Sequence, residues 1–112
     1  MALVLARRVG ELVTIRGDIF VELADICDSK ILLSVQSIQP LAFEFPDTTI
    51  DAGEGKFWLV KEDKLTINKY FKVRFNELKG AKIVLLGFEA PKNIIINRLE
   101  LGDNYEHGHT VD

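Results

Sequence analysis

The sequence predicts an all-β fold in one compact domain, and three observations carry this prediction. Valine and isoleucine together number 20 against seven alanines, a bias that favours strands over helices. No segment places its apolar residues at the 3.6-residue period of an amphipathic helix. Glycine, aspartate and proline separate short apolar stretches, as in chains built from short strands. The 112 residues suffice for one modest hydrophobic core.

Short predicted strands and tight turns fill the first part of the chain. Val9-Gly10, Arg16-Gly17-Asp18 and Cys27-Asp28-Ser29 have the small and polar composition of turns. Connections this short exclude parallel crossovers, so the strands they join must be antiparallel. The predicted strands of this part are residues 3–6, 12–15, 19–26 and 30–35, and a fifth short strand is expected before the linker.

A polar segment with one proline and two glycines, residues 46–56, is predicted to be a linker. The strand pattern then resumes and continues almost to the end of the sequence. Residues 102–112 are polar and contain two glycines, and we predict that they form a flexible tail. The predicted strands of this second part are residues 57–60, 64–67, 71–78, 83–88 and 94–99.

The two parts of the chain repeat each other. A shift of 52 residues places Thr14-Ile15 on Thr66-Ile67 and aligns strand with strand and turn with turn, which indicates a tandem duplication. By residue identity, the second copy is two residues shorter at its first turn, where Lys61-Glu62-Asp63 replaces residues 7–11. It is one residue longer near Leu86.

The charge is divided unevenly between the two parts. The formal net charge is −3, with four basic and nine acidic residues in 1–55 and ten basic and eight acidic residues in 56–112. This balance argues against indiscriminate binding of polyanions, so an anion site must be local. Half of the basic charge of the first part lies in one dipeptide, Arg7-Arg8.

Composition also argues against other classes of protein. No apolar run is long enough to span a membrane, and a lone cysteine, Cys27, fits the reducing cytoplasm, where we expect the protein to act. No set of residues suggests catalysis, so we expect no enzyme activity and no cofactor. We expect His107 and His109 to be solvated rather than bound to metal. Trp58 could stack on a nucleic-acid base, but we expect it to pack in the core.

Two stretches, one in each half, have a recognisable pattern. The first runs Leu3-Val4-Leu5-Ala6-Arg7-Arg8-Val9-Gly10-Glu11 and continues with Ile15 and Gly17-Asp18. The second comprises Leu78-Lys79-Gly80, Leu86-Gly87-Phe88-Glu89-Ala90-Pro91-Lys92 and Ile94-Ile95-Ile96-Asn97-Arg98-Leu99-Glu100. They closely resemble, respectively, the start and the fourth and fifth strands of the carbon storage regulator family, whose members are RNA-binding translational regulators. Together the two halves cover most of the chain, and most family members are about half as long.

The resemblance implies two copies of five antiparallel strands, interleaved so that the outer strands of each copy pair with the other copy. Residues 1–45 would form the first copy, 46–56 the linker, 57–101 the second copy and 102–112 the tail. The chain would then be an intramolecular pseudo-dimer and a monomer. The linker is also long enough for two chains to exchange copies in a domain-swapped homodimer.

The resemblance also implies an RNA site where the first strand of one copy meets the loop and fifth strand of the other. Arg7 and Arg8 match the arginine pair of the family, Arg98 matches its fifth-strand arginine, and Asn97 stands where a histidine is common. The predicted RNA-binding residues are Leu5, Arg7, Arg8, Ala90, Pro91, Lys92, Asn97 and Arg98.

At the other edge the matching residues are lost. Lys61-Glu62 aligns with the arginine pair, Glu44 with Asn97, Phe45 with Arg98 and Ile38 with Pro91. Acidic and aromatic side chains offer no donor for a phosphate or a base. We therefore expect one RNA site rather than two.

The resemblance implies a bacterial post-transcriptional regulator that binds GGA-type hairpin loops in mRNA leaders or small RNAs. Guanidinium groups bracket phosphates and the acceptor edge of guanine, and hairpin loops expose those edges. The alternative is a protein-interaction module, or a dominant-negative partner of an ordinary family member, that has lost RNA binding. The acidic first half and the apolar residues 41–45 would then form the partner surface. The family includes members controlled by a protein antagonist, so the resemblance also implies such an antagonist as a possible partner.

Overall fold

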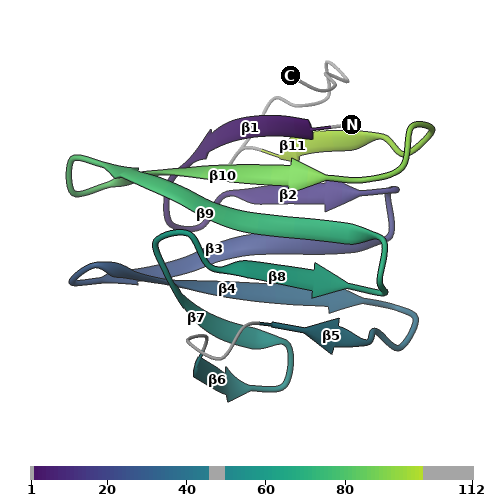
Figure 1. Cartoon of the computed structure of the whole chain (residues 1–112), viewed down its shortest axis with the longest axis horizontal. Coiled ribbons are helices and arrows are strands. Elements are labelled where there is room, and N and C mark those ends of the chain that lie inside the picture. The colour runs from purple at the N-terminus through teal and green to yellow at the C-terminus, as the bar shows by residue number, and fades with distance from the viewer. Residues whose placement is uncertain (1, 46–49, 100–112) are drawn as a thin grey trace.

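The computed structural model describes residues 2–45 and 50–99, and within them it is entirely β (Figure 1). Eleven strands form two antiparallel sheets, which confirms the predicted fold class. The strands are β1 (Ala2–Arg7), β2 (Leu12–Ile15), β3 (Ile19–Cys27), β4 (Lys30–Ser37), β5 (Phe43–Glu44), β6 (Ile50–Gly53), β7 (Lys56–Val60), β8 (Lys64–Ile67), β9 (Phe71–Lys79), β10 (Ile83–Glu89) and β11 (Ile96–Leu99). The described residues contain no helix that could cross a membrane.

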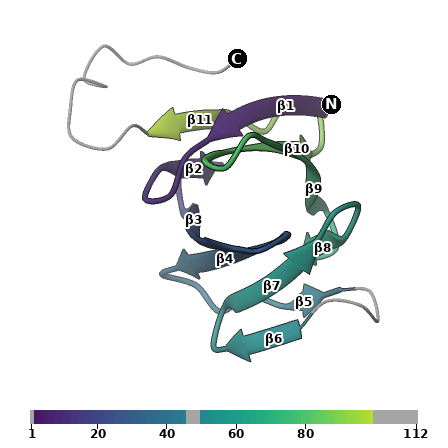
Figure 2. The same cartoon turned by 90° about the vertical axis from the view of Figure 1, so that its left-hand side faces the viewer.

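Each sheet takes strands from both halves of the chain. The first sheet has the order β1-β10-β9-β8-β5, so three strands of the second half lie between two strands of the first half. The second sheet has the order β11-β2-β3-β4-β7-β6, in which the two halves exchange roles and β6 is added at one edge. Figure 2 shows the two sheets facing each other, with β1 and β11 at one end and β5, β6 and β7 at the other.

The core lies between the two sheets and follows from the alternation of side chains along each strand. In β9, Phe71, Val73 and Phe75 are buried, while the residues between them face outwards. Side chains of the second sheet such as Leu23 and Leu33 meet them from the opposite side. Trp58 does not join this core: it lies half-buried on the outer face of β7, between the buried neighbours Phe57 and Leu59, so the expected core position is wrong.

Backbone hydrogen bonds show how the two copies align. The Gly10 N–H donates to the carbonyl of Leu23 at 2.8 Å, and the Glu62 N–H donates to the carbonyl of Phe75 at the same distance. The turns are therefore equivalent at a constant shift of 52 residues, and the predicted two-residue shortening is wrong. The structural counterparts of Arg7 and Arg8 are Leu59 and Val60, not Lys61 and Glu62.

The single insertion in the second copy lies in a turn. Cys27 pairs with Lys30 across the β3–β4 turn, whereas Lys79 pairs with Ile83 across the β9–β10 turn. The extra residue is therefore in this turn and not near Leu86, and the shift between copies is 53 from there on. Ile15 pairs with Ile96, and Ile67 pairs with Phe43. With that register Phe45 remains the counterpart of Arg98, as the sequence predicts.

The segment predicted to be the linker contains β6, which pairs antiparallel with β7. Two glycines make this hairpin: Gly53 has φ +125° and Gly55 has φ +67°, both in the region that favours glycine. At Gly55 a Cβ atom would lie 2.5 Å from the carbonyl oxygen of Val35, whose N–H donates to the Gly55 carbonyl at 2.7 Å. Glycines that indicated a linker thus form a turn that docks on β4. The predicted tail lies outside the described residues.

Candidate nucleic-acid interface

The edge strands of the two sheets, β1 and β11, lie side by side at one end of the molecule (Figures 1 and 2). β1 is the edge of the first sheet and β11 is the edge of the second, and no other described strand covers their outer sides. An edge strand presents a row of backbone N–H and C=O groups that the sheet itself does not use. We refer to this region as the β1/β11 edge.

The buried side chain of Arg7 connects the two strands of the β1/β11 edge through β2. Its side chain is only 3% exposed, its Nη1 donates to the carbonyl of Leu12 at 3.4 Å, and its Nε lies 3.7 Å from the carboxylate of Glu11. Leu12 belongs to β2, which pairs with β11. Arg7 therefore joins the end of β1 to the sheet that carries β11, and its guanidinium faces protein rather than solvent.

Arg8 differs from its neighbour because its side chain is exposed. Its backbone N–H donates to the Glu11 carboxylate at 2.8 Å, which holds the start of the β1–β2 turn. The same contact recurs in the second copy, where the Val60 N–H donates to Asp63 at 3.0 Å. The turn geometry is thus shared by both copies, while the cation at this position belongs to the first copy, since its counterpart is Val60.

Two polar side chains of β11 complete this part of the edge. Arg98 is half-buried and sits opposite Val13 of β2, one register position from Leu12, the residue whose carbonyl Arg7 reaches. The Oδ1 atom of Asn97 is buried and has no hydrogen-bond partner among the described residues. An acceptor left unsatisfied in this way costs about 1–3 kcal/mol.

The loop between β10 and β11 lies at the opposite end of β1 from Arg7. Ala2 pairs with Glu89 while Arg7 pairs with Val84, so Ala90 and Pro91 follow directly beside Ala2. The loop is fixed by two backbone hydrogen bonds, from the Ile94 N–H to Pro91 at 3.1 Å and from the Arg16 N–H to Ile95 at 2.9 Å.

The structure divides the predicted site residues into two groups. Pro91 and Lys92 are exposed, as Arg8 is, and Asn97 and Arg98 are partly so. The side chains of Leu5, Arg7 and Ala90 are buried, so these residues can meet a ligand only through their backbone. In β1, the inward-facing Leu5 and Arg7 alternate with the exposed Val4 and Ala6. The sequence did not indicate this alternation, because residues 3–6 are all apolar.

The opposite end of the molecule, which we call the β5/β7 edge, has different chemistry. Leu59 is fully buried where the first copy has Arg7, and Glu44 and Phe45 replace Asn97 and Arg98. The ring of Phe57 contacts the rings of Phe43 and Phe45, with centroids 4.8 and 5.2 Å apart. β6 then pairs with the side of β7 that corresponds to the open side of β1.

Charged pairs away from the β1/β11 edge shift two carboxyl groups. A hydrogen bond from Arg16 lowers the pKa of Asp18, and a hydrogen bond from Arg74 lowers the pKa of Glu62. Both pairs are on the surface, in turns or beside them. No cluster of possible metal ligands occurs among residues 2–45 and 50–99; His107 and His109 lie outside this range. Cys27 is exposed in the β3–β4 turn.

Sequence reasoning missed one group of residues on the outer face of the first sheet. Lys64 of β8 and Lys72 and Arg74 of β9 line a hollow there with Gly87 of β10. They are scattered in the sequence and meet only because the strands pair in register. Their one sequence signal is the basic excess of the second half.

No protein-family model, no curated protein and no solved structure matches this chain. The resemblance to the carbon storage regulator family therefore stays a prediction from the sequence.

Proposed function

We propose that this chain is a fused pseudo-dimer of the carbon storage regulator type, and that it regulates messenger RNA by binding GGA-type hairpin loops at the β1/β11 edge. The interleaved strand order supports the first part, because the first and fifth strands of each copy join the sheet of the other. The observation that carries the second part is the chemistry of the edge. Exposed Arg8 and half-buried Arg98 lie along two adjacent open strand edges.

This chemistry suits the unpaired bases of an RNA loop. Arginine brackets the O6 and N7 atoms of guanine or a phosphate, which are acceptors that an unpaired loop base or its backbone presents. Backbone groups of an edge strand add donors and acceptors at fixed spacing, and loop bases present free edges to them. Arg7 acts as a positioning residue, since its guanidinium is held by Glu11 and Leu12.

One RNA per chain follows from the β5/β7 edge. At that edge, Leu59, Val60 and Phe45 stand in place of the three arginines and offer no side-chain donor. Glu44 adds a negative charge. In addition, β6 occupies the outer side of β7. A ligand that needs two open strand edges has only one place to bind. The protein then acts as a monomer in the cytoplasm and cannot bridge two motifs on one transcript.

The test is a titration of labelled RNA hairpins, one with GGA in the loop and one with a scrambled loop, at fixed salt. We expect saturation at one GGA hairpin per chain and no comparable binding of the scrambled one. Arg98→Ala should lower the affinity for the GGA hairpin by about 5- to 150-fold, the range for one lost bidentate base contact. Lys30→Ala removes the same charge from the distant β3–β4 turn and should leave affinity unchanged. Two hairpins per chain would contradict the single site.

One observation favours the alternative of a protein-interaction module. Phe20, Leu32 and Trp58 are half-buried side chains on the outer face of the second sheet, where Leu32 pairs with Trp58. By contrast, Leu41 and Phe43 of the acidic segment first considered pack against the core. If no hairpin binds, and Arg98→Ala changes neither folding nor RNA affinity, this outer face becomes the surface to test with an ordinary family member as partner.

A further inference from the structure

Two neighbouring hollows on the outer face of the first sheet form a groove that begins at the β1/β11 edge. The first has a volume of about 180 Å³ and reaches from Ala2 and Val4 across Gly87 to Lys64. The second, of about 370 Å³, lies beside the Ala90–Pro91 loop and the β8–β9 turn. They share Ala2, Lys72 and Glu89 as lining residues, so they lie next to each other.

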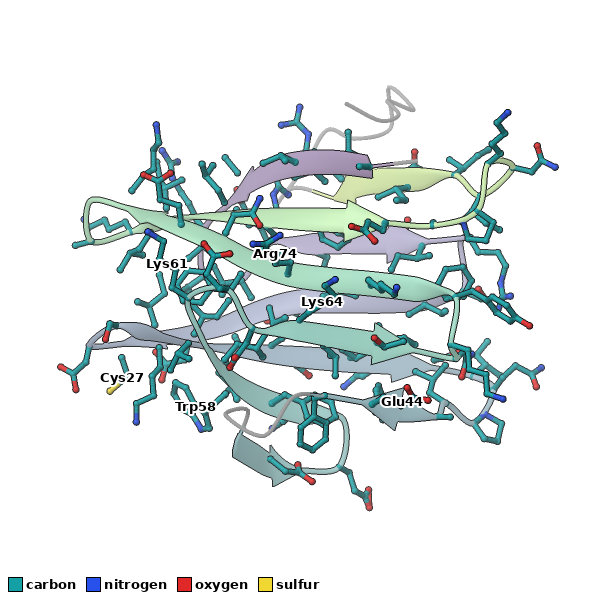
Figure 3. The ribbon with its side chains drawn as sticks, in the orientation of Figure 1. Cys27, Glu44, Trp58, Lys61, Lys64 and Arg74 are labelled. Carbon is teal, nitrogen blue, oxygen red and sulfur yellow. The ribbon has the colours of Figure 1, made fainter. Side chains whose placement is uncertain are left out.

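The lining of this groove is positively charged. Lys64, Lys69, Lys72 and Arg74 line it, against one carboxylate, that of Glu89. Glu62 pairs with Arg74 without lining the groove, so an excess of positive charge remains. Lys64 sits directly opposite Arg74 in the β8–β9 register, and both side chains lie on the face turned to the viewer in Figure 3.

The floor of the groove is a glycine. Gly87 lies between Val4 of β1 and Arg74 of β9 in the sheet register. A Cβ atom at this position would come within 3.1 Å of the side-chain amide of Asn76. The Asn76 side chain therefore lies over Gly87, in the space that a larger residue would fill, and its amide adds a hydrogen-bonding group to the floor beside the cations.

An exposed aromatic ring stands at the mouth of the groove. Tyr70 is 66% exposed and lies in the β8–β9 turn beside Pro91. The turn is held in place: the Asn68 N–H donates to the Ala42 carbonyl at 2.8 Å, and the Ala42 N–H donates to the Asn68 side chain at 2.9 Å. A ring presented on a fixed turn is suited to stack on an unpaired base.

The other copy shows that these residues are not a requirement of the fold. At the shift of 52 residues the counterparts of Lys64, Lys72 and Arg74 are Leu12, Phe20 and Glu22. Asp18 replaces Tyr70 in the equivalent turn. The cations and the ring are therefore confined to the face that adjoins β1.

We infer that this groove binds unpaired nucleotides that flank the recognised hairpin, with Tyr70 stacking on a base and Lys64, Lys72 and Arg74 contacting phosphates. The inference rests on the proposed function, because the hairpin bound at the β1/β11 edge brings its unpaired end towards the groove, which begins at Ala2 and Pro91. A cationic groove with an aromatic platform is the usual means of holding single-stranded nucleic acid without sequence preference.

The experiment compares four RNAs: the GGA hairpin, the same hairpin with eight uridines at its 5′ end or at its 3′ end, and octauridine alone. Affinity is measured over a series of salt concentrations. For the wild-type chain, one tailed hairpin should bind about tenfold or more tighter than the untailed one. Lys64→Gln/Lys72→Gln should abolish this gain and reduce the salt slope for that RNA by about 1.4, at about 0.7 per phosphate contact of a single strand. The untailed hairpin should bind equally well to both proteins.

Two further sets of variants separate charge from stacking. Lys30→Gln/Lys56→Gln removes the same charge from exposed positions of the second sheet and should keep the gain. Tyr70→Ala should lose part of the gain and Tyr70→Phe should retain it, since a phenylalanine ring still stacks.

The outcomes distinguish the inference from the function on which it rests. Equal affinity of tailed and untailed hairpins overturns the groove and leaves the loop site standing. Binding of octauridine that depends on Lys64 and Lys72, without binding of the untailed hairpin, supports the groove and overturns the loop site. A gain that survives the lysine variants assigns the flank to another surface and overturns the inference.

Discussion

At the β1/β11 edge the first strand ends in Arg7 and Arg8, and at the β5/β7 edge the equivalent strand ends in Leu59 and Val60. The turns that follow are the same, down to the hydrogen bonds that Glu11 and Asp63 accept. One edge is left open along both strands, and the other is closed by aromatic contacts and an added strand. The two copies thus keep the backbone of the repeat and differ in what they present at its edges.

The comparison shows how one end of a repeat can be closed while its backbone is kept. Apolar residues at the β5/β7 edge pack between the sheets and stabilise the closed end, which a ligand would otherwise have to desolvate. β6 satisfies backbone groups of β7 that an open edge would expose. The chain that connects the two copies therefore also covers one of the edges they form.

The largest expected effect comes from opening the β5/β7 edge. Phe57→Ala should lower the free energy of unfolding by about 3–5 kcal/mol, because it leaves a cavity where a ring 2% exposed meets Phe43 and Phe45. Phe57→Leu installs the residue found at the counterpart position, Leu5, and should cost only about 0.5–1.5 kcal/mol for the lost ring contacts. Urea denaturation measures both. Equal losses for the two variants would contradict the cavity explanation.

Arg7 and Arg8 should separate structure from binding at the β1/β11 edge. Arg7→Ala should lower the free energy of unfolding by about 1–3 kcal/mol, because the Ala6 and Leu12 carbonyls lose their donor and Glu11 loses its ion-pair partner. Arg8→Ala should leave the free energy of unfolding unchanged and lower the affinity for the GGA hairpin about 5- to 150-fold. Lys61→Ala is the matched loss of an exposed charge at the other edge and should change neither. If Arg8→Ala binds RNA like the wild type, the edge is not the site.

Restoring side chains alone should not reopen the β5/β7 edge. Glu44→Asn/Phe45→Arg installs the counterparts of Asn97 and Arg98, but Leu59 and Val60 remain and β6 still covers β7. We expect the stoichiometry to stay at one hairpin per chain in a calorimetric titration. A second bound hairpin would show that side chains, and not the closed strand edge, had removed the site.

The smallest effect concerns acid. A hydrogen bond from Arg74 holds the pKa of Glu62 below its ordinary value of 4.5, whereas the first-copy counterpart, Gly10, carries no charge. A folded-state pKa below the unfolded one means that ionised Glu62 contributes to stability above about pH 4.5, and that this contribution is lost as the pH falls through the folded-state pKa. Glu62→Gln should therefore differ slightly from the wild type in unfolding midpoint at pH 7 and converge with it near pH 3. A difference independent of pH would exclude the ion pair as its cause.

Much of this protein follows from its sequence alone. β-branched residues, short apolar stretches and turn residues predicted the all-β class and the position of almost every strand, because these signals are local. The repeat predicted that Phe45 and Glu44 stand where Arg98 and Asn97 do, which the strand register bears out.

Tertiary structure decided the rest, and the alignment of the two first strands shows why. A shift of two residues keeps every side chain on the same face, since the period of a strand is two, so the apolar pattern cannot tell a shift of 52 from one of 54. Only the hydrogen bonds from Gly10 to Leu23 and from Glu62 to Phe75 identify Leu59 as the counterpart of Arg7. The burial of Arg7, the pairing of β6 with β7 and the gathering of Lys64, Lys72 and Arg74 on one face likewise depend on contacts between residues far apart in the chain. The local sequence carries no record of those contacts, because they arise only when the strands pair.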